Sequence, residues 1–444
     1  MAKKQKITVY RCSECGHEES KWLGRCPECG QWNTLLQTAV STTQTVPQNS
    51  LIQSLPLSSV DPQEGTRIPS GIPELDRVLG GGIMKRSAVL VGGEPGIGKS
   101  TLLLQAASSA LTKGRILYIS GEESAGQVRM RADRLGIDGS HIEICCSGRL
   151  PDINSILEAV KPIIVVVDSV QTLHSDDLGL VPGTINQMKY CSWELISWVK
   201  EHDAALFLVA HVTKEGVISG PKTLEHMVDT VLYFEQNDAD SRFLRAAKNR
   251  FGSVDEIGIF TMGEKGLSIV EDPSLLFLVS REGELPPGVA TAAVLEGTRS
   301  LLVELQALTV PAKGTVSRVF SDRIDNAKVS RIAATLEKHL GIRLSDHDLY
   351  INVAGGIRIS EVGVDLALAA CLYSARTGIS LPARTAITGE LSLAGEVRPV
   401  RRLSGRIKAA KSLGFESFIG PASEDEAVLG AVTNIKQAIK LLFS

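Results

Sequence analysis

A nine-residue stretch, Gly93–Thr101 with the sequence GEPGIGKST, constrains the fold of this 444-residue chain more than any other feature. It matches GxxxxGK[ST], follows the apolar run SAVLVGG and precedes the helix-forming run TLLLQAASSAL, which is the context of a phosphate-binding loop. There, backbone N–H groups surround phosphate oxygens, Lys99 reaches the β- and γ-phosphates and Ser100 binds Mg²⁺. We therefore predict that ATP binds with Mg²⁺. The residues expected to contact the nucleotide are Gly93, Glu94, Pro95, Gly96, Ile97, Gly98, Lys99, Ser100 and Thr101.

Short apolar runs alternate with helix-forming segments on both sides of this loop. Examples of these runs are SAVLVGG, RILYIS, PIIVVVD, AALFLVA and DTVLYFE. Continuous apolar runs of this length favour buried parallel strands that are covered by helices on both faces. We therefore predict an α/β ATPase domain with a parallel sheet over residues 67–272.

Charged or titratable side chains follow three of these predicted strands. Asp168 ends PIIVVVD, where it is placed to hold Mg²⁺ through water. Glu122 lies in ISGEES and can activate the attacking water; its neighbour Glu123 remains an alternative, and so does a structural role for both. His211 ends FLVAH and is expected to sense the γ-phosphate, although a histidine that only satisfies core or loop contacts also fits.

The first 36 residues contain two CxxC pairs with ten residues between them. Each pair directs two thiolates at one point, and two pairs complete a tetrahedral Zn²⁺ site. A unit of this size cannot build a core, so metal binding would supply much of its folding free energy. We predict a structural zinc ribbon over residues 1–36 and a flexible Ser/Thr/Gln/Pro-rich linker over 37–66. The predicted zinc ligands are Cys12, Cys15, Cys26 and Cys29.

Charge and hydropathy restrict which partners and which compartment we expect for the chain. The formal net charge is −3, so contacts with nucleic acid would have to come from local basic patches. No apolar run approaches the roughly 18–20 residues that span a bilayer. The basic start, MAKKQK, is not followed by the apolar core of a signal peptide. We expect a cytoplasmic protein without membrane contact.

Two further stretches carry a resemblance to known proteins. IPSGIPELDRVLGGGIMKRSAVLVGGEPGIGKST, residues 68–101, resembles the start of the RecA-like ATPase core. KNRFG, residues 248–252, together with SGEES and the CxxC pairs, is similar to the signature of the bacterial RadA (Sms) family, and the resemblance extends over all of the chain except the linker. It implies a homo-oligomer, expected to be a hexameric ring, that moves on single-stranded DNA and processes branched recombination intermediates with a RecA recombinase.

The same resemblance implies roles for two cations and two loops. Lys248 and Arg250 would lie at a subunit boundary and reach the neighbour's γ-phosphate, although a solvated basic turn remains open. A cation from a neighbour would neutralise transition-state charge and make hydrolysis depend on assembly. The loops Ser175–Thr184 and Thr213–Lys222 are candidates for lining a DNA channel, with lysines of the second loop on the phosphates.

After a Pro/Gly connector over 273–290, residues 291–444 resemble the α+β proteolytic domain of Lon. On that resemblance Gly363 takes the place of the catalytic serine and Ser404 that of the lysine, so the Ser–Lys nucleophile is missing. An ATP-dependent peptidase is thus disfavoured, and a nucleotide-switched scaffold is the other rival. Residues 384–411 carry seven Lys or Arg and two Glu, and residues 299–343 carry eight Lys or Arg and four acidic residues. Both patches fit contact with duplex DNA or an ordinary solvated or subunit face.

Overall fold

The computed structural model describes residues 8–19, 21–39, 56, 58, 66–179, 181–211, 223–236, 241–279, 281, 283–314, 317–422 and 430–444. Its contacts separate two compact units. The first consists of residues 1–235, 244–254 and 262–267, and the second of residues 236–243, 255–261 and 268–444. Most of the predicted linker over 37–66 lies outside the described residues, as does the predicted channel loop Thr213–Lys222 with Lys214 and Lys222.

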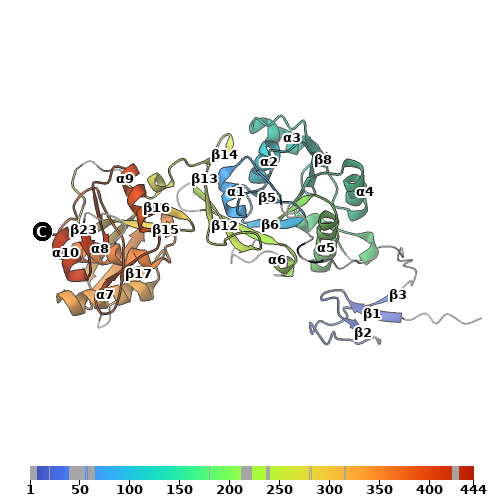
Figure 1. The fold of residues 1–444 in the computed structure, drawn as a ribbon. Coiled ribbons are helices and arrows are strands. Elements are labelled where there is room, and N and C mark those ends of the chain that lie inside the picture. Colours follow the sequence, from blue (N-terminus) through green and yellow to red (C-terminus); the bar gives the residue numbers. More distant parts are fainter. Residues whose placement is uncertain are drawn as a thin grey trace, which may run out of the picture. The chain divides into compact units, whose positions relative to one another are not determined.

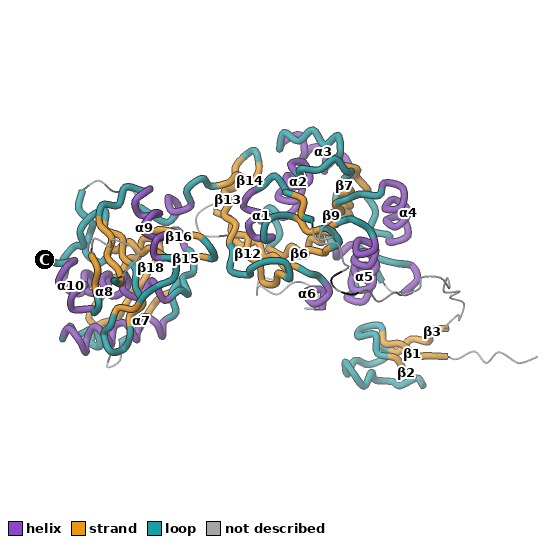
Figure 2. The backbone as a smooth tube through the Cα atoms, in the orientation of Figure 1, coloured by secondary structure: helices purple, strands orange, loops and turns teal. Residues whose placement is uncertain are grey.

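The amino-terminal ribbon is a small antiparallel sheet in the order β2-β1-β3 (Figure 2). Its strands are β1 (Thr8–Cys12), β2 (Glu18–Glu19) and β3 (Leu35–Ala39). Among the ribbon side chains that the structure describes, those of Cys12, Cys26 and Leu35 form the buried cluster. So few apolar side chains stabilise a fold only slightly, which is the situation in which a metal supplies the remainder.

The first unit is built on a sheet with the strand order β14-β13-β12-β11-β6-β10-β9-β7-β8. The neighbouring strands in the part of the sheet from β11 to β8 all pair in parallel. This confirms the predicted α/β class. Strands β12, β13 and β14 have residues in both units. The bounds are β6 (Ser87–Gly93), β7 (Ile116–Ser120), β8 (Ile142–Cys145), β9 (Ile164–Asp168), β10 (Ala205–His211), β11 (Thr230–Gln236), β12 (Ser241–Asn249), β13 (Ile257–Gly263) and β14 (Gly266–Ile269), with the short pair β4 (Arg67–Ile68) and β5 (Ile83–Met84) beside them.

Helices cover both faces of this sheet (Figure 1). Along β9, Val165 and Val167 pack with α4 and α5, whereas the alternate residue Val166 lies with Leu103 and Ala106 of α2. This alternation explains why the strand is apolar throughout. No helix in the described ranges is long and apolar enough to cross a membrane. The helices are α1 (Pro73–Leu79), α2 (Lys99–Ser109), α3 (Ala125–Arg134), α4 (Leu150–Val160), α5 (Ile185–Glu201) and α6 (Thr223–Met227).

Strand register fixes which residues meet at the carboxyl edge of the sheet. His211 at the end of β10 lies beside Gly93 at the end of β6. Ser120 at the end of β7 lies beside Asp168 at the end of β9. Ligands of open parallel sheets bind at this edge, so the predicted phosphate loop, Asp168 and His211 share one site.

The second unit contains a mixed sheet in the order β17-β18-β16-β15-β19-β22-β23. The hairpin β15–β16 turns between Glu296 and Arg299. Helices α7, α8 and α10 pack in its main core, and α9 packs with β15 and β16 in a smaller one. The elements are β15 (Val289–Glu296), β16 (Arg299–Pro311), β17 (Val319–Ser321), α7 (Asn326–Leu340), β18 (His347–Val353), α8 (Asp365–Thr377), β19 (Thr385–Ile387), β20 (Glu390–Leu391), β21 (Val397–Arg398), α9 (Leu403–Ser412), β22 (Ser417–Pro421), β23 (Gly430–Val432) and α10 (Ile435–Leu442).

Candidate active site

The phosphate loop connects β6 to α2 and depends on its glycines. Gly96 and Gly98 have φ values of 78° and 114°, which side-chain-bearing residues rarely adopt. A Cβ on Gly93 would lie 2.7 Å from the carbonyl oxygen of Phe234, so the loop also passes too close to β11 for any other residue. Helix α2 begins at Lys99, and its N-cap Gly98 has no side chain to bind the first N–H groups. Those N–H groups remain for phosphate oxygens.

Lys99 is almost completely buried in this loop. It is 4% exposed, and its Nζ donates to the carbonyl oxygens of Gly93 at 2.7 Å and Glu94 at 2.9 Å. Burial lowers the pKa of Lys99 to about 8, although the charges of Asp168 and Glu122 favour its protonated form. The amine is therefore held at the loop by partners that phosphate oxygens can replace, and it titrates close to neutral pH.

Asp168 is oriented by a buried tyrosine. The Oη of Tyr118, on β7, donates to Oδ2 of Asp168 at 2.6 Å. Burial raises the pKa of Tyr118 well above its usual range, and the charge of Asp168 adds to this, so the hydroxyl stays a donor. One carboxylate oxygen is thereby fixed, and the other remains for Mg²⁺ or its water ligands.

The two glutamates that follow β7 have different surroundings. Glu123 forms an ion pair with Arg131 of α3. Glu122 instead accepts a hydrogen bond from Oγ of Ser169 at 2.5 Å, and its side chain is 49% exposed. Glu123 is thus held by a helix, whereas Glu122 lies beside the end of β9 with access to solvent.

His211 lies between the loop lysine and Glu122. Its Nδ1 is 3.4 Å from Nζ of Lys99, and its Nε2 is 3.6 Å from Oε1 of Glu122. An ammonium group can only donate, so a hydrogen bond from protonated Lys99 would make Nδ1 the acceptor and place the ring proton on Nε2, which faces the carboxylate. The structure therefore joins Lys99, His211 and Glu122 in one polar chain.

Lys248 and Arg250 are bound within their own unit. Oδ1 of the buried Asp229 pairs with Nη1 of Arg250 at 3.1 Å. Burial lowers the pKa of Lys248, and the neighbouring Arg250 contributes to this. The Nζ of Lys248 donates to three backbone carbonyls at the carboxyl end of α6, those of Glu225 at 2.9 Å, His226 at 3.4 Å and Val228 at 2.7 Å. Both cations thus stabilise the end of α6 and its approach to β11 in the single chain.

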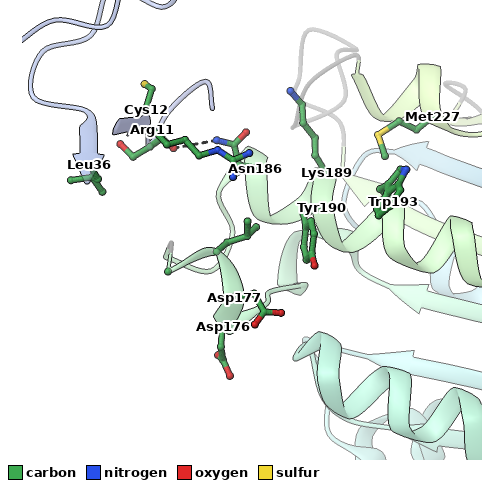
Figure 3. A pocket seen from close by; sticks show the side chains of 13 residues that line it. Arg11, Cys12, Leu36, Asp176, Asp177, Asn186, Lys189, Tyr190, Trp193 and Met227 are labelled. Atoms are coloured by element: carbon green, nitrogen blue, oxygen red, sulfur yellow. Dashed lines mark hydrogen bonds between the residues drawn. The ribbon is translucent and has the colours of Figure 1, made fainter. Parts of the chain in front are cut away.

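The predicted channel loop Ser175–Thr184 is described except for residue 180. It carries a short 3₁₀ turn, and Asp176 in this turn is paired with Arg149 at 2.7 Å. Figure 3 shows Lys189 and Trp193 projecting from α5 above this turn. Trp193 is 55% exposed. An exposed aromatic ring beside a lysine is a feature that can stack on single-stranded bases, and the sequence analysis did not identify it.

The four predicted zinc ligands converge in the ribbon. Their sulfur atoms all lie within 4.8 Å of one another. Two sulfur–sulfur distances are 3.6 Å, between Cys12 and Cys29, and 3.5 Å, between Cys15 and Cys26. Sulfurs bound to one tetrahedral Zn²⁺ at about 2.3 Å are about 3.8 Å apart, so the residues fit the ion.

In the second unit, the place that the Lon resemblance assigns to a nucleophile is filled. A Cβ on Gly363 would lie 2.6 Å from Oε1 of Glu361 and 2.9 Å from Nη1 of Arg406. Arg406 is fully buried and forms an ion pair with Glu361. The buried Lys328 donates to the carbonyl oxygens of Ser360 and Glu361. In the described part of this unit, Lys328 and Arg406 are both bound to these partners, and neither lies at Gly363 as a free amine beside a hydroxyl.

Sequence reasoning missed Tyr118 and Ser169, the two hydroxyls that orient the carboxylates. Tyr118 left a signal, because a tyrosine in a predicted buried strand needs a partner for its hydroxyl, and Tyr118 has one in Asp168. Ser169 left none, because its complete burial, which requires a partner for the hydroxyl, is seen only in the structure. The sequence also does not show whether Glu122 or Glu123 accepts the hydrogen bond from Ser169.

Comparison with known proteins agrees with this architecture. A model of the KaiC ATPase family matches residues 68–145, a rubredoxin metal binding domain model matches residues 10–37, and a model of subunit ChlI of Mg-chelatase matches residues 319–424. The DNA repair protein RadA of Treponema pallidum is 53% identical over 100% of this chain and 99% of its own length. Those of Brucella abortus and Bacillus subtilis are 43% and 41% identical over 94% and 97% of the chain, and over 92% and 97% of their own lengths.

Proposed function

The chain belongs to the RadA family of DNA repair proteins, and from this premise we propose that it is a DNA-dependent ATPase. In this proposal the protein assembles into a ring, expected to be hexameric, and moves on single-stranded DNA to drive branch migration with a RecA recombinase. The observation that carries the ATPase part is the convergence of Lys99, Asp168, Glu122 and His211 at one edge of the parallel sheet.

In the proposed mechanism the phosphate loop binds ATP through its backbone N–H groups. Lys99 exchanges the carbonyls of Gly93 and Glu94 for β- and γ-phosphate oxygens, and Ser100 and Asp168 hold Mg²⁺. Mg²⁺ held by these residues would neutralise charge on the phosphates. The hydrogen bond from Tyr118 orients Asp168 for this role.

Glu122 then orients and deprotonates the attacking water. Its half-exposed carboxylate is open to a water in line with the γ-phosphate. His211 contacts both Glu122 and the phosphate-loop lysine, so a change at the γ-phosphate would reach the carboxylate through one side chain. This is the basis on which we assign His211 as the γ-phosphate sensor.

Completion of the site by a neighbouring subunit is the second part of the proposal. Lys248 and Arg250 would reach the neighbour's γ-phosphate and neutralise charge in the transition state. Lys248 would then leave the carbonyls that end α6. Because α6 directly follows the candidate channel segment 213–222, assembly, hydrolysis and DNA contact would be linked through this helix.

The test is the rate of ATP hydrolysis with and without single-stranded DNA. We expect DNA to stimulate the unchanged protein and Lys248→Ala to lose that stimulation. Lys265→Ala, at an exposed lysine in the turn between β13 and β14, is the matched control for removing a cation. A rate that is indifferent to DNA would favour the nucleotide-switched scaffold, and unwinding of a forked duplex separates a motor from that scaffold.

A further inference from the structure

We propose that Ser169 is a positioning residue for hydrolysis, because its hydroxyl holds the carboxylate of Glu122 at the reacting end of the site. This inference rests on the proposed function of Glu122 and assigns a role to a residue that has none in the mechanism above. The hydroxyl of Ser169 donates to Oε1 of Glu122 at 2.5 Å, and Ser169 itself is fully buried. A buried hydroxyl keeps its protein partner, because no water is available to accept its hydrogen bond instead.

The backbone that carries Ser169 is itself anchored. The hydroxyl of Thr172 donates to the carbonyl oxygen of Ser169 at 2.7 Å. The N–H of Gly121 donates to the carbonyl oxygen of Asp168 at 2.9 Å, which ties the end of β7 to the end of β9. A Cβ on Gly121 would lie 1.8 Å from Oγ1 of Thr172, so the loop that carries Glu122 is pressed directly against this turn. The backbone segments that carry Ser169 and Glu122 are therefore packed against each other and joined by a hydrogen bond.

Glu122 needs such a restraint more than the other carboxylates of the site. Its side chain is 49% exposed, and an exposed glutamate samples several rotamers. Asp168, in contrast, is short, lies at a strand end and is fixed by Tyr118. The hydrogen bond from Ser169 leaves the second oxygen of Glu122 for a water. Consecutive residues, Asp168 and Ser169, would thus set the distance between the Mg²⁺ ligands and the water-activating carboxylate.

The positioning role predicts a defect in the rate constant and not in nucleotide binding. We expect Ser169→Ala to lower kcat about tenfold to hundredfold, which is the scale of a misplaced catalytic group. KM and the affinity for a fluorescent ATP analogue should change less than about twofold, because Ser169 contacts no residue of the phosphate loop among its hydrogen bonds in the described chain. Ser192→Ala, which removes a fully buried hydroxyl from α5, is the control for the general cost of such a change.

A double-mutant cycle separates positioning from a structural effect. Glu122→Gln, Ser169→Ala and the double variant are compared by single-turnover hydrolysis with labelled ATP, with thermal unfolding to confirm that each folds. If Ser169 acts through Glu122, Ser169→Ala lowers the rate only when Glu122 is present. Equal losses in both backgrounds, or full activity of Ser169→Ala, overturn the proposal. Full activity of Glu122→Gln instead contradicts the proposed function of Glu122, so the two failures are distinguishable.

Discussion

The ATPase unit and the carboxy-terminal unit each hold a glutamate and a basic side chain in one polar cluster, yet only the first arrangement is suited to chemistry. In the ATPase unit, Lys99 is held by two carbonyls and Glu122 is half exposed. In the other unit, Arg406 is fully buried and paired with Glu361. Its guanidinium also donates to the carbonyl oxygens of Ala293 and Arg401, at 2.6 and 3.0 Å.

The difference teaches that partners and solvent access decide what a charged cluster does. The partners of Lys99 are backbone oxygens that a phosphate can replace without leaving a buried charge unpaired. The Glu361–Arg406 pair has no such exchange, because separating it would leave the charge of the fully buried Arg406 without its carboxylate partner. The first cluster has the exchangeable partners that the proposed function requires, and the second joins β15, α9 and the segment before α8.

The largest effect should come from removing the exposed carboxylate of the first cluster. Glu122→Gln keeps the hydrogen-bond acceptor for Ser169 but cannot take a proton from water, so we expect hydrolysis to fall by about 10²–10⁴-fold. Glu123→Gln is the matched control, because it alters the neighbouring carboxylate and only disturbs the ion pair with Arg131. Single-turnover hydrolysis measures both. A larger loss in the Glu123 variant would reverse the assignment of the base.

The buried pair of the second cluster should respond in stability instead. Arg406→Met leaves Glu361 without its partner, and breaking a buried ion pair costs about 3–5 kcal/mol of unfolding free energy. Arg384→Met is the control, since its ion pair with Glu416 is exposed and should contribute little. Urea unfolding of the full chain measures the difference. Unfolding curves that coincide for the two variants would show that the second cluster is not a structural device.

The sequence predicts features that depend on local spacing better than contacts that depend on the tertiary structure. GxxxxGK[ST], the apolar runs and the CxxC pairs depend on local spacing, so the sheet, the phosphate loop and the zinc ligands could be predicted. The contact of Ser169 with Glu122 depends on the register of β7 against β9, which no local pattern contains. Likewise Arg406 counted as part of a basic surface patch by its sequence neighbours, but the structure buries it completely. Burial of a single residue is a tertiary property, which is why the sequence charge overstated that patch.

The pH dependence of ATP binding tests whether Lys99 exchanges its backbone partners for phosphate oxygens. Burial lowers its pKa to about 8, and phosphate oxygens favour its protonated form, so ATP binding should take up a proton above pH 8. The dissociation constant for ATP should then be flat below pH 8 and rise by about tenfold for each pH unit above it. Calorimetry between pH 7 and 9.5 measures this. Lys99→Arg keeps its charge over that range, so any residual ATP binding by this variant should lose the dependence.

The smallest effect concerns what remains of the basic patch after Arg406 is removed from it. Arg398 is near Glu390 and Glu396, and Arg384 is paired with Glu416. Within residues 384–411, four exposed cations have no carboxylate partner among the described ion pairs: Arg401, Arg402, Lys408 and Lys411. If this face binds duplex DNA, reversing Arg401 and Arg402 to Glu should weaken binding and reduce the slope of log K against log salt by about two. The same double reversal at Lys436 and Lys440, which are exposed on α10 and outside both basic patches, controls for net charge. Binding that is unchanged over the whole salt titration would rule out duplex DNA contact by Arg401 and Arg402 and leave an ordinary solvated or subunit face, in contrast to the buried pair of the same unit.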